Sequence, residues 1–202
     1  MENTTKERIL DEALVAFAAN GYKGTNLRAL AAGMGLSKSA LYKHYAGKED
    51  IRNAVLDRME ACYSERFGAS ENIPQAPKSC GELYTMTMQM PDFTMHGQKV
   101  TLTRRLLLME QFHDERARHF ATRYFLNNTK EIYTHIFAEM MENGILKKDA
   151  PEILAFAYTS PISVLIRLCG REPEKEPEIM QQIEAFIKQF IKTYAQPRKC
   201  CE

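Results

Sequence analysis

The 202-residue sequence has no tryptophan and only five cysteines. The cysteines are odd in number and fit no zinc-finger spacing, which argues against a chain stapled by disulfide bonds or by a structural metal. Reduced thiols are therefore expected. Two of the five stand at the C-terminus in RKCCE, where a redox role is open but an incidental role is the simpler prediction. The cysteines are Cys62, Cys80, Cys169, Cys200 and Cys201.

Long apolar runs are also lacking. The longest uncharged stretch, ILAFAYTSPISVLI at residues 153–166, is shorter than the roughly 20 residues that span a bilayer, and it contains Pro161. The first ten residues, MENTTKERIL, contain no apolar signal core. We therefore predict a cytoplasmic protein, with a buried helix rather than a membrane anchor at 153–166.

Patterns that carry enzyme chemistry are absent from the sequence. Its histidines and carboxylates show no nucleophile–base spacing, no glycine-rich phosphate loop and no HExxH motif. The run MTMQMPDFTMH offers thioethers and an imidazole, which suit Cu(I), but only Met86 and Met90 of the central methionines share a helical face. We predict no enzyme, no cofactor and no metal site.

Strand-like alternation of apolar and polar residues is lacking too, whereas helical periodicity recurs along the whole chain. The predicted fold class is all-α. Thr4 or Thr5 with Glu7 can cap a first helix that stops at Asn20-Gly21, and Gly33 and Gly47 end two short helices after it. Further helices are expected from Lys48, from residue 80 to a stop at Pro91, and over 99–112, 114–144 (unbroken or broken once), 151–168 and 177–194.

Negative charge is missing from one interval, because no acidic residue lies between Glu12 and Glu49. Five cations fall within it, so a basic face is hidden in a chain whose formal net charge is only +1. A solvated surface that happens to lack acids is the alternative interpretation. The cations are Lys23, Arg28, Lys38, Lys43 and Lys48.

The same interval has the spacing of a helix-turn-helix, with a helix at 25–33, a glycine-containing turn and a second helix, capped by Ser37, that runs to about Tyr45. In that motif the second helix enters the major groove of DNA and its flanks hold phosphates. Small Ser39 and Ala40 would permit close approach to bases, so DNA is the predicted partner. The helix-turn-helix and the helix before it are called here the head. Its small core is expected to contain Leu27, Leu30, Leu36, Leu41 and Tyr45.

The segment ILDEALVAFAANGYKGTNLRALAAGMGLSKSALYKHYAGKEDI, residues 9–51, resembles the tetracycline-repressor-like (TetR) family of transcriptional regulators. Met34 and Ser39 depart from residues common in the family, and the Ser39 hydroxyl could shift the preferred DNA sequence. The matching positions are Phe17, Gly21, Tyr22, Thr25, Leu30, Ala31, Gly35, Leu36, Ser37, Tyr42, His44, Tyr45, Lys48 and Glu49.

The resemblance implies a homodimeric repressor that binds a palindromic operator and is released from DNA when a small molecule binds its C-terminal domain. The implied domains are a helix-turn-helix DNA-binding domain at 1–50 and a helical ligand-binding and dimerisation domain at 51–202. The implied DNA contacts are Thr25, Arg28, Ser37, Lys38, Ser39, Ala40, Tyr42, Lys43, His44 and Lys48.

Apolar, adaptable side chains between about 80 and 150 suit a ligand pocket, although such residues at helical spacing also form ordinary core. The pocket candidates are Met86, Met90, Phe93, Met109, Phe112, Phe120, Tyr124, Phe137 and Met141. The last two helices either complete a monomer core or build a four-helix bundle with a second copy, and the resemblance implies the bundle. The interface candidates are Leu154, Ala157, Pro161, Val164, Leu165, Ile179, Ile183, Phe186, Ile187 and Phe190.

Two alternative functions stay open from the sequence. One is a small-molecule-binding or enzymatic helical protein whose DNA-binding heads are vestigial. The other is a regulator switched by oxidation of Cys200 and Cys201.

Overall fold

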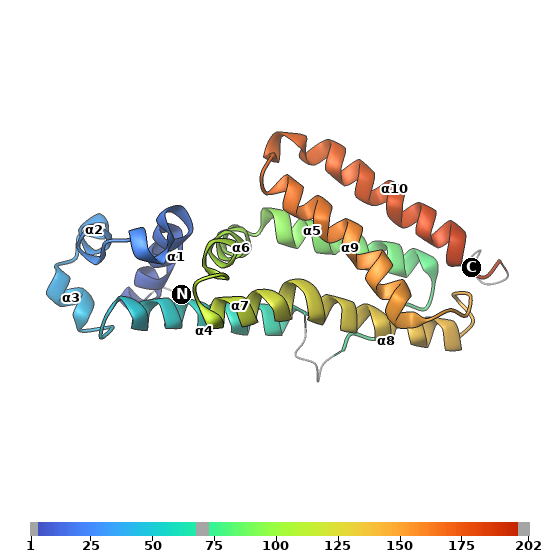
Figure 1. The fold of residues 1–202 in the computed structure, drawn as a ribbon, viewed down its shortest axis with the longest axis horizontal. Coiled ribbons are helices and arrows are strands. Elements are labelled where there is room, and N and C mark those ends of the chain that lie inside the picture. The colour runs from blue at the N-terminus through green and yellow to red at the C-terminus, as the bar shows by residue number, and fades with distance from the viewer. Residues whose placement is uncertain (1–3, 68–72, 198–202) are drawn as a thin grey trace. The chain divides into compact units, whose positions relative to one another are not determined.

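The computed structural model describes residues 4–67 and 73–197, and its regular elements over these residues are helices, with one isolated antiparallel bridge between Leu146 and Ala195 (Figure 1). The all-α prediction is confirmed. The chain packs into two compact units: unit 1 comprises residues 1–66 and 98–122, and unit 2 comprises residues 67–97 and 123–202. The functional division predicted at residue 50 stays a prediction.

Unit 1 contains the elements of the predicted head and three further helices. The first helix begins as predicted, because the Thr4 hydroxyl accepts a hydrogen bond from the Glu7 amide and the Glu7 carboxylate accepts one from the Thr4 amide at 2.7 Å. Gly21, at φ 70°, breaks the helical geometry of α1 where the Asn20-Gly21 stop was predicted. The helices are α1 (Thr5–Gly24), α2 (Leu27–Gly33), α3 (Lys38–Tyr42), α4 (Lys48–Phe67), α6 (Gln98–Glu110) and α7 (Glu115–Thr122).

The apolar faces of α1 to α4 meet in one core. Leu30, Leu41 and Tyr45 are buried as predicted, whereas Leu27 and Leu36 are only half-buried. Ion pairs tie neighbouring helices to α1, since the Asp11 carboxylate lies 2.9 Å from Arg58 on α4 and 2.7 Å from Lys99 on α6. Other buried core residues are Ile9, Ala13, Leu14, Phe17, Ala31, Ile51, Val55, Leu56 and Met59.

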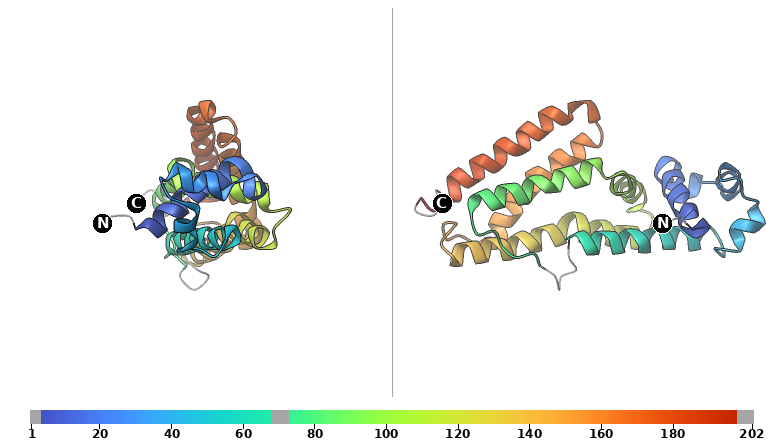
Figure 2. Two further views of the ribbon diagram at one scale, coloured as in Figure 1. Left: turned by 90° about the vertical axis from the view of Figure 1, so that its left-hand side faces the viewer. Right: turned by 180° about the vertical axis from the view of Figure 1, so that it is seen from behind.

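Unit 2 is a helical bundle in which α10 packs against both α5 and α9, and α9 packs against α8 (Figure 2). The one break allowed in the predicted helix over 114–144 is a π-helical stretch, Arg123–Asn127, which lies between α7 and α8. The elements of this unit are α5 (Cys80–His96), η1 (Arg123–Asn127), α8 (Asn128–Glu142), α9 (Pro151–Cys169), η2 (Pro173–Lys175) and α10 (Glu176–Tyr194).

Two predicted helix ends are wrong. Helix α5 continues through Pro91 to His96, because a packed helix tolerates the single backbone hydrogen bond that proline cannot donate. The Thr94 hydroxyl donates to the Met90 and Pro91 carbonyl oxygens of the same helix, at 2.8 and 3.1 Å. Helix α3 ends at Tyr42 rather than near Tyr45.

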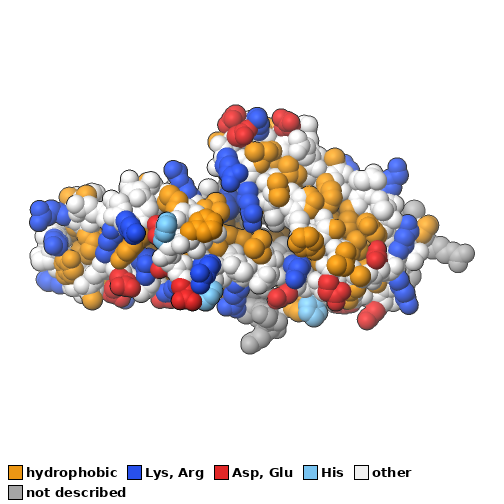
Figure 3. Space-filling model, in the orientation of Figure 1, with side chains coloured by type: hydrophobic (Ala, Val, Ile, Leu, Met, Phe, Trp, Pro, Cys, Tyr) orange, Lys and Arg blue, Asp and Glu red, His pale blue; other side chains and the backbone are white. Residues whose placement is uncertain are grey.

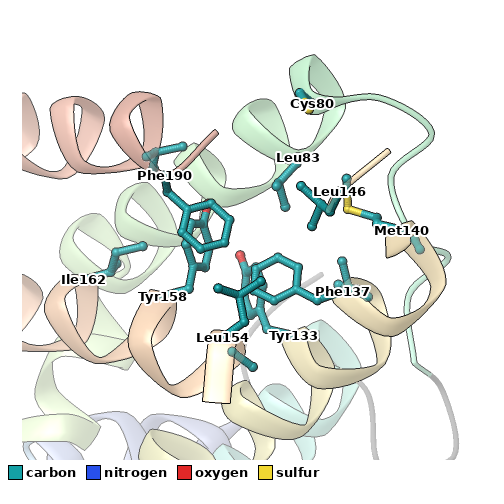
Figure 4. Close-up of a cluster of buried hydrophobic side chains, with 14 of the residues drawn as sticks. Cys80, Leu83, Tyr133, Phe137, Met140, Leu146, Leu154, Tyr158, Ile162 and Phe190 are labelled. Carbon is teal, nitrogen blue, oxygen red and sulfur yellow. The ribbon is translucent and has the colours of Figure 1, made fainter. Parts of the chain in front are cut away.

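Aromatic rings fill the centre of unit 2 (Figure 4). The Phe190 ring lies 4.3 Å from the Tyr158 ring and stacks at 5.3 Å on that of Phe137 (centroid distances). Buried Thr87 joins two tyrosines, since its hydroxyl accepts a hydrogen bond from Tyr158 at 2.9 Å and lies 3.0 Å from the Tyr133 hydroxyl. Burial raises the pKa of Tyr158, and raises that of Tyr133 to about 12, so both phenols stay neutral.

Helix α9 is half-buried rather than buried as predicted. One face packs into the core, while Ile153, Phe156 and Val164 are 69, 61 and 60% exposed. By length and composition alone this helix could cross a membrane, since its most apolar 18-residue stretch has a mean hydropathy of 1.4 and a third of that stretch is buried. The core helices of soluble proteins can be as long and as apolar. Because Ile153, Phe156, exposed Ala157 and Val164 recur at helical spacing, they form one apolar stripe, called here the outer face of α9.

Candidate nucleic-acid interface

Helix α3 is a short element that its own sequence caps and orients. The Ser37 hydroxyl accepts a hydrogen bond from the Ala40 amide at 3.1 Å and lies 2.9 Å from the Ser39 hydroxyl. The turn before it needs glycine, because Gly35 adopts φ 69°. Leu41 is fully buried and anchors the helix in the head core. The opposite face of α3 is thereby directed outward.

Polar and basic side chains occupy that outward face. Lys38, Ser39 and Lys43 are exposed, Tyr42 is 43% exposed, and Ala40 is half-buried. His44, one residue beyond the cap of α3, is exposed as well. The face therefore offers an ammonium group, hydroxyls and one small side chain near the helix start, which are the groups that contact base edges and phosphates.

An open groove of about 610 Å³ lies where the end of α1 meets the starts of α2, α3 and α4. Four of the residues that line it are cations and none is acidic, so we call it the basic groove. Lys and Arg side chains are visible at the α2–α3 end of unit 1 (Figure 3). Its lining is Lys23, Gly24, Thr25, Asn26, Leu27, Arg28, Lys38, Tyr42 and Lys48.

Contacts within the head hold two of the lysines of the basic groove. Lys48 Nζ donates to the Lys23 carbonyl oxygen at 3.3 Å and lies 4.7 Å from the centroid of the Tyr22 ring. Lys38 Nζ lies 5.4 Å from the centroid of the Tyr42 ring. Aromatic faces attract ammonium groups without neutralising their charge. Both lysines thus keep their charge for an anionic ligand.

Thr25 differs from the predicted site, because its side chain is buried. Its hydroxyl donates to the carbonyl oxygens of Gly21 at 2.8 Å and Ala16 at 3.1 Å, and so satisfies the kinked end of α1. The prediction that this side chain contacts phosphate is therefore corrected. Lys23, by contrast, lines the basic groove although it was not predicted as a contact. Its place in the acid-free interval was the signal that could have found it.

The predicted ligand-pocket residues are divided between the two units. Met109, Phe112 and Phe120 belong to unit 1, and the other six belong to unit 2. Phe112 is corrected, because it lies in the turn after α6 and is 82% exposed. Phe120 packs edge-on against Tyr63 at 5.7 Å. Of the six in unit 2, Met86, Met90 and Phe93 are half-buried, whereas Tyr124, Phe137 and Met141 are buried.

Half of the predicted interface residues are core residues of their own chain. The apolar stripe of α10 packs onto α5 and α9 of the same unit, and Leu154 of α9 packs into the same core, so these buried residues cannot also meet a partner and are corrected. Ala157 and Val164 are exposed, while Pro161, Leu165 and Phe186 are half-buried. The corrected residues are Leu154, Ile179, Ile183, Ile187 and Phe190.

Among the cysteines within residues 4–67 and 73–197, Cys80 departs from the expected reduced state. Cys80, the first residue of α5, is disulfide-bonded, whereas Cys62 and Cys169 take part in no disulfide. The predicted redox pair Cys200 and Cys201 lies outside the described residues.

Comparison with known sequences gives a family for the head. The family described as bacterial regulatory proteins, tetR family, matches residues 9–55, which contain α2, α3 and most of α1. The biofilm operon negative transcriptional regulator IcaR of Staphylococcus epidermidis is 39% identical over 46 residues, which are 23% of this chain and 25% of that protein. TtgW of Pseudomonas putida, an HTH-type transcriptional regulator, is 38% identical over 52 residues, 26% of this chain and 39% of that one. The chain thus aligns with well under half of either curated relative.

Solved structures extend the likeness to the whole chain at the level of fold. A TetR-family transcriptional regulator from Mesorhizobium loti gives a TM-score of 0.67 at 18% identity and covers 97% of this chain and 100% of that one. SmeT, the repressor of the Stenotrophomonas maltophilia efflux pump SmeDEF, gives 0.65 at 16% identity and covers 96% of this chain and 92% of that one. Residues 9–55 therefore match the tetR family of bacterial regulatory proteins, and the chain as a whole has the fold of solved TetR-family regulators.

Proposed function

We propose that the protein is a ligand-responsive transcriptional repressor that binds a palindromic operator as a homodimer. The observation that carries the proposal is the basic groove, with its four cations and no acid, next to the outward face of capped helix α3. Matching charge to the phosphate backbone supplies affinity, and a short exposed helix can reach base edges in the major groove. As DNA is its partner, the cytoplasm is its proposed location.

The proposed roles follow from position along α3 and around the groove. Lys38, Ser39 and Ala40, at the start of α3, read base edges. Side chains at the groove and beyond α3 hold phosphates and set the register of the helix. Those side chains are Lys23, Arg28, Tyr42, Lys43, His44 and Lys48, while Ser37 acts through its cap.

Dimerisation is proposed to use the outer face of α9. Three large apolar side chains of this face are more than half exposed, and a second copy would remove them from water. Ala157 and Val164 were already among the predicted interface residues, and half-buried Pro161, Leu165 and Phe186 can border the contact. Two heads must stand about 34 to 36 Å apart to reach successive major grooves, so a dimer implies a two-fold symmetric operator.

Release by a small molecule is proposed for unit 2. SmeT, which has a similar fold, has been solved in complex with triclosan. A ligand that prefers a conformation with misplaced heads depletes the DNA-competent state, and a preference of about 1.4 kcal/mol changes occupancy about tenfold. Half-buried Met86, Met90 and Phe93 of α5 are the adaptable side chains proposed to contact it.

The proposal is tested by selecting the DNA duplexes that the protein binds from a random pool. The affinity for the most enriched duplex is then measured at increasing salt concentration. We expect a two-fold symmetric consensus and an affinity that falls steeply with salt. Lys48→Ala should weaken all duplexes alike, Lys38→Ala should relax base preference, and Lys148→Ala, a control lysine exposed in unit 2, should change neither. A protein that enriches no sequence and retains no duplex at low salt would overturn the proposal.

The disulfide at Cys80 favours a second candidate, a regulator switched by thiol oxidation. If it is correct, operator affinity differs between oxidised protein and protein reduced with dithiothreitol, and Cys80→Ser abolishes the difference. Equal affinity under both conditions would exclude this candidate and leave the first proposal standing.

A further inference from the structure

Tyr22 lies at the meeting point of the head and the end of α6 within unit 1. Its ring is faced by two cations one turn apart on α4, since both Lys48 Nζ and the Arg52 guanidinium carbon lie 4.7 Å from the ring centroid. The ring therefore contributes to the placement of Lys48, a lysine of the basic groove. What fixes Tyr22 and Arg52 consequently fixes part of the proposed phosphate site.

The backbone of Tyr22 is held by a carboxylate at the end of α6. Gly21 leaves helical geometry, and the amide N–H of Tyr22, the next residue, donates a hydrogen bond to Glu110 Oε1, 2.9 Å away. The approach is close, since a Cβ on Gly21 would lie 3.2 Å from the same oxygen. The Glu110 carboxylate thus occupies space beside the kink at Gly21 that a larger residue would partly fill.

A second carboxylate holds the other cation. Arg52 Nη1 lies 2.8 Å from Asp114 Oδ2, and both side chains are only 15% exposed. The other Asp114 oxygen accepts a hydrogen bond from the Ala117 amide at 2.7 Å, at the start of α7. A charge pair so well shielded from water fixes its members more firmly than a surface pair does.

We propose that Glu110 and Asp114 are positioning residues for DNA binding, which hold Tyr22 and Arg52 so that Lys48 is aimed at phosphate. The inference rests on the proposed function and extends it to residues remote from the basic groove. Neither carboxylate lines that groove or belongs to the acid-free interval. Their effect on DNA is therefore exerted through Tyr22 and Arg52.

The long-range effect of the charge of these carboxylates and their proposed positioning role predict opposite changes in DNA affinity when a carboxylate is removed. Replacing a carboxylate by a neutral side chain removes one negative charge and so raises the net charge of the protein by one. By long-range electrostatics alone, this change strengthens DNA binding slightly. Removing a positioning contact weakens it. If Lys48 loses a phosphate contact, the slope of log affinity against log salt also falls, by about 0.9 for each head. A purely structural role in folding would leave that slope unchanged.

The experiment measures operator affinity across a salt series for four variants of the full chain. Glu110→Ala should bind about fivefold to tenfold more weakly with a reduced salt slope, as expected for a weakened phosphate contact. Glu110→Gln keeps an oxygen that accepts from the Tyr22 amide and should bind like wild type. Asp114→Asn keeps the α7 cap but loses the charge pair with Arg52, and should also weaken binding. Glu115→Ala is the matched control, since Glu115 is exposed and makes the same charge change.

Tyr22 gives a second pair of variants in case Glu110→Ala fails to fold. Tyr22→Phe keeps the ring and should bind like wild type, whereas Tyr22→Leu removes the face seen by both cations and should bind like Glu110→Ala. Folding of each variant is checked by circular dichroism.

The outcomes separate the inference from the function on which it rests. If wild type binds the operator and folded Glu110→Ala and Tyr22→Leu bind as tightly with an unchanged salt slope, the positioning role is wrong and DNA binding stands. If wild type binds no duplex, both are overturned.

Discussion

Replacing Thr87 with valine should destabilise the protein by more than the loss of one hydrogen bond. The Thr87 hydroxyl joins two buried phenols, those of Tyr133 and Tyr158, and burial raises the pKa of both. Valine has almost the same shape, so the packing survives while both phenols lose their partner. At about 1 to 3 kcal/mol for each of the two unsatisfied buried phenols, the expected loss is about 2 to 6 kcal/mol.

Removing the phenol hydroxyls as well should restore much of that loss. In a Thr87→Val, Tyr133→Phe, Tyr158→Phe triple variant no hydroxyl of this cluster is left, and replacing both partners by apolar groups of the same shape is close to neutral. The triple variant should therefore be more stable than Thr87→Val alone. Such non-additivity is the signature of shared partners.

Urea unfolding followed by circular dichroism measures the three free energies, at one protein concentration because dimerisation would make stability depend on it. Tyr63→Phe serves as a control for removing a buried phenol outside the cluster, in unit 1. The reasoning is refuted if Thr87→Val unfolds within about 0.5 kcal/mol of wild type, or if the triple variant is the less stable of the two.

Three further predictions concern the cap, the dimer and pH. Ser37→Ala removes the cap of α3 and should cost about 1 kcal/mol of stability together with operator affinity, as read by unfolding and by DNA titration. Val164→Glu places a charge on the outer face of α9 and should shift the protein toward monomer in sedimentation, whereas an unchanged dimer would exclude that face. Hydrogen bonds that His96 donates to the Asp92 and Glu176 carboxylates raise its pKa, so its stabilising contribution is complete below its ordinary pKa of 6.5 and lost as pH rises through the raised value. His96→Gln should therefore lower stability at about pH 6 and not at about pH 9, and equal effects at both would contradict this assignment.

Local signals in the sequence predicted the head well. The capping box at Thr4 and Glu7, the stop at Gly21 and the cap at Ser37 each depend on side chains within a few residues of the backbone groups they satisfy. The outward lysines of the head were predicted for a similar reason, since an interval without acids is basic however it folds. Buried Thr25 was the exception, because its hydroxyl turns inward to the kink in α1, a contact that no spacing reveals.

In unit 2, the sequence predicted the helices but not what their apolar faces pack against. Periodicity identified α9 and α10 as helices with apolar stripes, but an apolar stripe packs equally well against its own chain or a second one. The structure buries predicted Ile183 and Ile187 within the chain, leaves predicted Val164 exposed, and exposes Phe156, which was not predicted, beside it. Pro91 likewise marks a stop by local rules, yet packing carries α5 past it.

The all-α class, the helix-turn-helix and its basic face could be predicted from the sequence, because caps, glycine turns and missing acids act over a few residues. Which apolar faces are already covered, and that the distant carboxylates of Glu110 and Asp114 reach Tyr22 and Arg52, became known from the folded chain. Those contacts join residues about 60 to 90 positions apart, and side-chain periodicity carries no information about partners at that separation.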